Sequence, residues 1–106
     1  MTHRAIFHPR TETDVREAMA HYDGRSPGLG ERFKRTFYAT VDEMLFLPEK
    51  NAVKADGGIR TRLMRPFPYL IFHAIEHDIV FVLAVQYAGR KPAHLRAVVH
   101  ERRVIE

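Results

Sequence analysis

The spacing of hydrophobic residues divides the chain into a largely helical first half and an extended second half. A short apolar segment, residues 3–8, predicts a strand that ends before Pro9. In residues 11–22 and 26–47, apolar side chains recur every three or four positions, which is the period of an amphipathic helix. The first half therefore predicts one strand followed by two helices.

Capping residues set the expected ends of the two helices. Thr11 and Ser26 stand where helices take N-caps, and Pro27 suits a first helical position. Gly24 suits a left-handed C-cap, and Pro48 ends the second helical pattern. Because the link between the helices is short, we expect an antiparallel helix hairpin.

The second half changes to the period of strands. Residues 59–64 alternate between two faces, whereas residues 68–75 and 79–86 are apolar on both faces, as central strands are. The tight link at residues 76–78 predicts a hairpin between the last two. Residues 93–106 fit a helix or a strand equally well.

These elements predict a single α+β domain over residues 1–106. Residues 93–106 are a C-terminal extension for which the sequence does not decide between helix and strand. Three consecutive strands form an antiparallel meander, and the first strand makes a sheet of about four strands, at an edge or beside the last. The helix hairpin covers one face of the sheet, and the other face needs its own cover. The predicted core residues are Phe33, Phe37, Val41, Leu45, Ile71, Phe81, Leu83 and Val85.

Two prolines stand at the start of one of the most apolar segments, "RPFPYLIFH". Proline fixes its own φ, removes a backbone donor and disfavours helix in the residue before it. Pro66 and Pro68 therefore predict a stiff, extended corner over residues 65–68, with the strand beginning at Tyr69.

Composition narrows the function classes. The chain has no cysteine, which excludes a disulfide scaffold, cysteine-ligated zinc and a thiol nucleophile. It contains no apolar run approaching a membrane span and its start does not resemble a signal peptide, so we expect no membrane partner and a cytoplasmic location. The net charge of +4 lies entirely in residues 59–106, which hold eight Lys or Arg and four Asp or Glu. An acidic partner, protein or nucleic acid, suits that half.

Motifs for metal, phosphate or serine chemistry are weak. Glu76, His77 and Asp78 are expected to form a solvated turn rather than a metal site. No glycine-rich phosphate loop is present, and Ser26, the single serine, fits a cap. We therefore expect no cofactor and no metal.

Five segments in order resemble the RelE/ParE superfamily of bacterial toxins, especially the ParE-like branch of plasmid stabilisation proteins. The resemblance spans Ala5 to Pro92. It rests on the first strand, on "DVREAMAHYDGRSPGLGERFKRTF", on a helix ending over residues 45–48, on "RPFPYLIFH" and on "IVFVLAVQYAGRKP". The chain departs from the pattern at His73, which takes the place of a tyrosine, and at Tyr87, which takes the place of a histidine.

The resemblance implies the toxin of a type II toxin–antitoxin pair, which binds DNA gyrase and is neutralised by a cognate antitoxin with an acidic or amphipathic tail. The alternative is a RelE-like endoribonuclease that cuts messenger RNA on the ribosome. Cleavage needs cations and proton-transfer groups, and the candidates are Arg62, Arg65, His73, Tyr87 and Arg90. A non-toxic orphan binding protein is the third possibility. On balance the sequence favours a binding protein over an enzyme.

Five cations are candidates for partner binding: Arg60, Arg62, Arg65, Arg90 and Lys91. Alternation puts Arg60 and Arg62 on one face of a strand, and the meander is expected to bring most of the five to one side. We also expect an apolar groove along the open face of the sheet and the second helix, because such patches mark partner sites.

Overall fold

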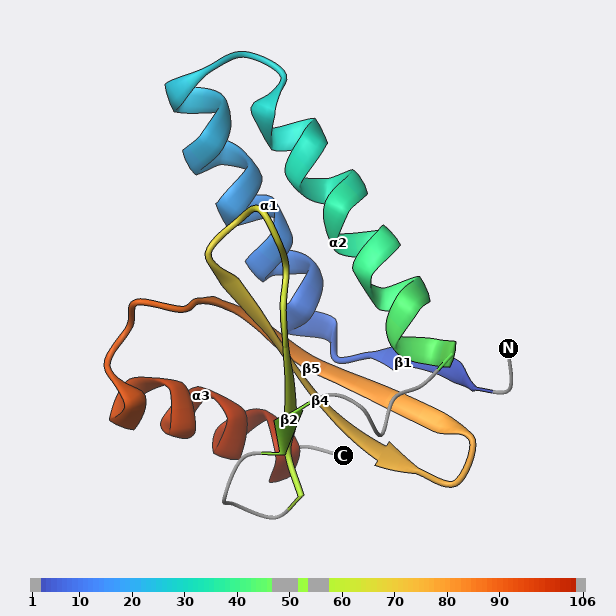
Figure 1. Ribbon diagram of the computed structural model, residues 1–106. Coiled ribbons are helices and arrows are strands. Elements are labelled where there is room, and N and C mark those ends of the chain that lie inside the picture. The colour runs from blue at the N-terminus through green and yellow to red at the C-terminus, as the bar shows by residue number, and fades with distance from the viewer. Residues whose placement is uncertain (1–2, 47–51, 54–57, 105–106) are drawn as a thin grey trace.

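The computed structural model describes residues 3–46, 52–53 and 58–104. In these residues the elements are β1 (Arg4–Phe7), α1 (Pro9–Arg25), α2 (Leu29–Phe46), β2 (Ala52–Val53), β3 (Arg60–Leu63), β4 (Tyr69–Glu76), β5 (Ile79–Tyr87) and α3 (Pro92–Val104). The strands form one mixed sheet in the order β1-β5-β4-β3-β2, in which only β1 and β5 run parallel. The α1–α2 hairpin lies over one face of the sheet and α3 over the other (Figure 1).

This architecture confirms the predicted α+β class, the helix hairpin and the antiparallel meander. β1 occupies an edge beside the last strand, as expected. β2 adds a short fifth strand. Pro48, which the sequence predicts to end the second helix, lies outside the described residues, and so does most of the loop that follows it.

The start of α1 differs from the sequence prediction. The helix begins at Pro9, and the cap is His8, whose backbone is extended and whose Nδ1 accepts a hydrogen bond from the Arg10 N–H. Proline is tolerated at a first helical position because its missing N–H would have no partner there. Thr11 lies inside the first turn, and its hydroxyl donates to the Val82 carbonyl. Thr11 therefore joins the helix to the sheet and does not cap it.

The link between the two helices also differs. α1 continues through Gly24, its C-cap is Ser26, and α2 begins only at Leu29. The Asp23 carboxylate accepts a hydrogen bond of 2.8 Å from the Gly30 N–H, one of the donors that the first turn of a helix leaves unpaired. A Cβ at Gly30 would stand 2.5 Å from the Met19 carbonyl oxygen, so this close approach of the helices requires glycine.

The two central strands are out of simple alternation at one point. Phe72 pairs with Ala84 and His73 pairs with Val82, so Leu83 is an extra residue in β5. As a result Leu83 and Ala84 both pack on the α3 side, whereas Val82 and Val85 pack on the hairpin side. The bulge thus allows two successive residues of β5 to face the α3 side, while the residues before and after them face the hairpin side.

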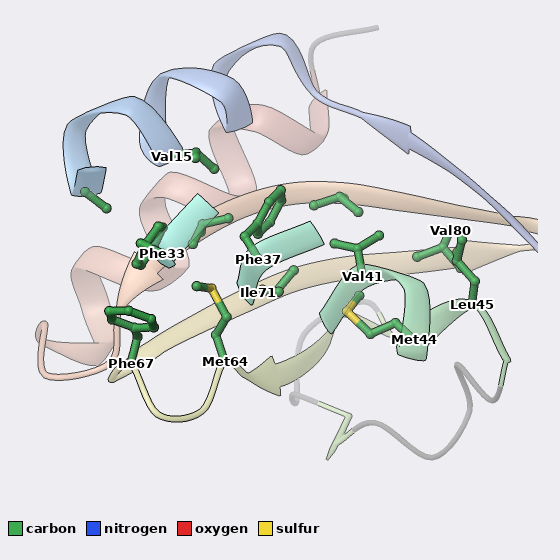
Figure 2. Packing of buried hydrophobic residues seen from close by; sticks show 13 residues of the cluster. Val15, Phe33, Phe37, Val41, Met44, Leu45, Met64, Phe67, Ile71 and Val80 are labelled. Atoms are coloured by element: carbon green, nitrogen blue, oxygen red, sulfur yellow. The ribbon is translucent and has the colours of Figure 1, made fainter. Parts of the chain in front are cut away.

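The larger core lies between the hairpin and the sheet, and Figure 2 shows its packing. It contains Phe33, Phe37, Val41, Leu45, Ile71 and Val85, all predicted, together with Met44, Met64 and Phe67 among others. Leu83 is buried in the smaller core under α3. Phe81 was expected to be buried but is only partly so, because it faces α3 where the cover is incomplete.

The two prolines flank a buried aromatic side chain. Residues 65–68 form a turn with a cis bond between Arg65 and Pro66, which corrects the expected extended corner. The Phe67 ring lies 5.0 Å from that of Tyr22 and 5.1 Å from that of Phe33, measured between centroids. The prolines therefore hold the turn that carries Phe67 into the hairpin core.

The C-terminal segment forms the helix α3 and provides the second cover for the sheet. Leu95, Val98 and Val99 of α3 pack with Phe72 and Leu83 of the sheet. The sequence is compatible with either a helix or a strand here. The structure shows a helix, and the apolar residues that face the sheet recur at helical spacing. Ile105, another apolar residue of this segment, lies outside the described part of the chain.

A buried ion pair joins the two helical layers. Arg102 of α3 donates two hydrogen bonds to the Asp14 carboxylate of α1, of 2.6 and 2.9 Å, and a third to the Leu83 carbonyl. The same carboxylate accepts a hydrogen bond of 2.9 Å from the Val85 N–H. Both side chains are nearly inaccessible, at 5% and 6% exposure. Neither residue is among the core or site residues that the sequence predicts.

We predict that Phe37→Ala lowers the free energy of unfolding by about 3 kcal/mol or more, because it empties space in the hairpin core. Urea denaturation measures this change. Phe46→Ala, in the same helix at 61% exposure, is the matched control and should change stability far less. Equal effects of the two substitutions would contradict the helix register.

We predict that Arg102→Met destabilises the fold by about 3 kcal/mol or more, because it leaves the Asp14 carboxylate buried without its partner. The double variant Asp14→Asn, Arg102→Met should cost less than the sum of the single changes, with a coupling of about 1–3 kcal/mol. The exposed neighbour Arg103→Met serves as control. If Arg102→Met were no more harmful than Arg103→Met, the ion pair would not hold α3 in place.

Candidate functional site

A groove of about 850 Å³ lies between α3 and the open part of the sheet face. α3 packs mainly on β5, so it covers the neighbouring β4 surface only in part: Phe72 is buried, whereas Leu70 is half-buried. Leu70 and Phe72 of β4 line this surface together with Ile59, and Leu95 and Val99 line the side formed by α3. The floor of the groove is therefore aliphatic and aromatic.

Basic side chains accompany this apolar lining. Arg90, Arg96, Arg103 and His100 line the groove, and no Asp or Glu is among its described lining residues. The Arg90 guanidinium lies 2.9 Å from Nε2 of His94 on α3. The expected apolar groove thus exists on the open face of the sheet, but it runs along α3 and not along the second helix. The sequence does not place the groove beside α3, because the apolar pattern of residues 93–106 fits a helix and a strand equally well.

The five candidate partner-binding cations do not form one patch. Arg62 lies against α2, where its Nη2 donates to the Glu43 carboxylate at 2.7 Å, and Arg65 lines a shallow hollow with both residues. Arg60 shares the strand face of Arg62. Arg90 lines the groove on the opposite face of the sheet, and exposed Lys91 comes immediately before α3. Arg60, Arg62 and Arg65 thus lie on the α2 side, and Arg90 lies apart from them on the α3 side.

His73, a candidate for proton transfer, is completely buried. Its Nδ1 lies 3.3 Å from the Ile71 carbonyl oxygen. The pKa of His73 is lowered to about 4, chiefly by burial and to a lesser extent by the charges of Arg60 and Arg62, while the backbone hydrogen bond to Ile71 acts in the opposite direction. The side chain is thus a neutral core histidine at pH 7.

Tyr87 and Arg90 lie near one end of the sheet. The Tyr87 side chain is 47% exposed, and its ring lies 5.9 Å from that of Tyr69. Tyr69 in turn lies 6.1 Å from Tyr22, and burial raises the pKa of both of these phenols. Tyr22 and Tyr69 were not predicted as site residues. Aromatic residues from α1, β4 and β5 meet here only because the fold brings these elements together.

The five residues proposed for RNA cleavage are thus divided among three places. Arg62 and Arg65 lie beside α2, His73 lies inside the core, and Tyr87 and Arg90 lie near the end of the sheet. Among the residues that the structure describes, no three His, Asp or Glu side chains are grouped as metal ligands. No helix in the described ranges is long and apolar enough to cross a membrane.

The fold is an α+β fold in which a helix hairpin and a C-terminal helix cover a mixed sheet. The same fold occurs in a chain of the chromosomal ParDE TA system from P. aeruginosa, with a TM-score of 0.74 and 12% sequence identity. The match covers 83% of this chain and 98% of that chain. No family model and no curated protein matches this chain. The structural likeness confirms the ParE-like fold that the sequence resemblance implies.

We predict that stability falls as pH falls from 7 to 5, because the unfolded chain takes up a proton at His73 that the folded chain does not. With a folded pKa of about 4 and an unfolded pKa of about 6.5, the free energy of unfolding falls by about 2 kcal/mol between pH 7 and pH 5. It continues to fall until the pH is below the folded pKa, where His73 is protonated in both states.

His73→Leu should remove that part of the pH dependence, and His21→Leu on the exposed side of α1 should keep it. Urea denaturation at both pH values, with NMR titration of the ring, measures the effect. A His73 resonance that titrates near 6.5 would contradict the prediction.

Proposed function

We propose that this protein is the toxin of a type II toxin–antitoxin pair, that it acts by binding, and that a cognate antitoxin neutralises it. The observation that carries the proposal is the fold shared with a chain of a ParDE TA system. The apolar groove adds support, because a partly exposed apolar surface suits a partner protein.

The positions of the candidate residues favour binding over RNA cleavage. General acid–base catalysis needs its groups within hydrogen-bonding reach of one substrate. His73 is buried, and Arg62 and Arg90 lie on different faces of the sheet. DNA gyrase is therefore the target that we propose, and the ribosome with its messenger RNA is the alternative. Either target would place the protein in the cytoplasm.

Arg60, Arg62, Arg65, Arg90 and Lys91 stay part of the proposal as partner-binding residues, on two surfaces. Arg90 and Lys91 stand beside the groove, whereas the other three belong to the α2 side. Charge on each surface would mainly set encounter rate and specificity. Reversal of Arg62 and of Arg90 should therefore affect different partners.

We predict that induced expression in a bacterial host stops growth, and that co-expression of a cognate antitoxin, sought among the open reading frames beside the gene, restores it. The same gene with an early stop codon is the control. Inhibition of supercoiling by purified gyrase would support the proposed target, whereas cleavage of messenger RNA in a purified translation system would favour the nuclease. Normal growth with abundant folded protein would overturn the toxin proposal.

A further inference from the structure

We propose that the strand β1 pairs with β1 of a second copy of this chain, antiparallel across a two-fold axis, so that the two sheets become one. In the described residues β1 has a neighbouring strand, β5, on one side only. The inference goes beyond the proposed function and does not depend on it, because it comes from the edge of the sheet and not from a likeness to another protein.

The backbone of β1 offers hydrogen bonds at this edge. The N–H groups of Arg4 and His8 each donate to a carbonyl within residues 78–82, at 2.9 Å. In a parallel ladder alternate residues of a strand bond to the same neighbour, so Ile6 between them also bonds to β5. Ala5 and Phe7 therefore direct their N–H and C=O groups away from β5, toward the side where a further strand would lie.

Apolar side chains are exposed on both faces of this edge. Phe7, at 38% exposure, and Tyr38 of α2, at 47%, lie on the hairpin face with their ring centroids 6.1 Å apart. Ile6, at 40% exposure, lies on the opposite face beside the half-buried Phe81. Edge strands are commonly protected from pairing by a charge or a proline. Residues 5–7 carry neither, and a second strand would cover the apolar side chains on both faces at once.

The sequence of β1 matches itself in one antiparallel register. With the axis at Ile6, each Ala5 exchanges backbone hydrogen bonds with the partner's Phe7, and the two Ile6 side chains meet. A small residue then lies opposite a large one on the hairpin face. An axis at Ala5 would instead oppose Ile6 to the partner's Arg4. An axis at Phe7 would oppose Ala5 to the partner's Pro9, which has no N–H to donate. This self-match favours a second copy as the occupant of the edge.

Charges on α2 fit the same symmetry. A two-fold axis normal to the sheet reverses the direction of α2 in the partner, as it does that of β1. Tyr38 marks the part of α2 that lies next to β1. Arg35 stands three residues before it and Asp42 four residues after it, and both are exposed. In the antiparallel arrangement each Arg35 comes opposite the partner's Asp42, so the two helices present opposite charges to each other.

Sedimentation velocity at increasing protein concentration tests for the dimer. We expect the full chain to change from monomer to dimer as its concentration is raised. Ile6→Lys puts a charge at the axis and should weaken dimerisation about tenfold or more. Leu63→Lys makes the same change at a similarly exposed position of β3, at 36% exposure, and should alter the dissociation constant by no more than about twofold.

A disulfide tests the register, because the chain has no native cysteine to interfere. In the proposed register residue 6 and its equivalent form a non-hydrogen-bonded pair, with their Cα atoms about 4.5 Å apart, a separation that a disulfide spans. Under mild oxidation at a concentration where the wild-type chain is dimeric, Ile6→Cys should form a covalent dimer. We expect this reaction to be at least about tenfold faster than that of Leu63→Cys, the matched control.

A wild-type chain that stays monomeric over the whole concentration range would overturn the inference. A dimer that Ile6→Lys and Leu63→Lys weaken equally would overturn it too, and so would equal rates of oxidation for the two cysteine variants, because the chain would then associate elsewhere. Circular dichroism of each variant establishes that it is folded. If Ile6→Lys does not fold, the milder change Ile6→Cys still decides the question. Growth experiments test the proposed function separately, and neither result changes the meaning of the other.

Discussion

The ion pair between Asp14 and Arg102 supplies hydrogen-bond partners for backbone groups of β5 that have no neighbouring strand at that edge. β1 pairs with β5 only as far as Val82, and β5 continues to Tyr87. Beyond that point the Asp14 carboxylate accepts from the Val85 N–H, and Arg102 donates to the Leu83 carbonyl. Two side chains thus replace the missing part of a strand, and because they bind each other they join α1 to α3 around the sheet.

This attachment explains why the groove lies where it does. Arg102 stands near the C-terminal end of α3, so the ion pair draws that helix over β5 rather than to the middle of the sheet. The bulge at Leu83 turns two successive residues toward α3 and strengthens the same contact. On the β4 side of the face Phe72 is buried, but Leu70 is covered only in part. A constraint at one edge of β5 therefore determines which apolar surface stays open.

Periodicity predicted most of the fold because the hairpin core is built from regular patterns. Phe33, Phe37 and Val41 recur at helical spacing and are buried as predicted. The errors lie where a side chain binds the backbone of a distant element. Asp14 fits the first turn of a helix in sequence, yet its carboxylate binds a residue 71 positions away. Arg102 resembles any solvated arginine until α3 is placed on the sheet. Such contacts have no local period, so the sequence alone cannot show them.

The same distinction separates the two kinds of arginine in the basic half of the chain. In the sequence the arginines of that half cannot be told apart, but in the fold some of them are buried and others are exposed. Arg102 is buried, and its Nη1 and Nη2 donate to Asp14 and Leu83, so its charge is used inside the domain and is not presented to a partner. Arg96 and Arg90 are exposed beside an apolar surface, where a charge adds little stability. Their charges therefore stay at the surface, and the domain does not depend on them for its fold.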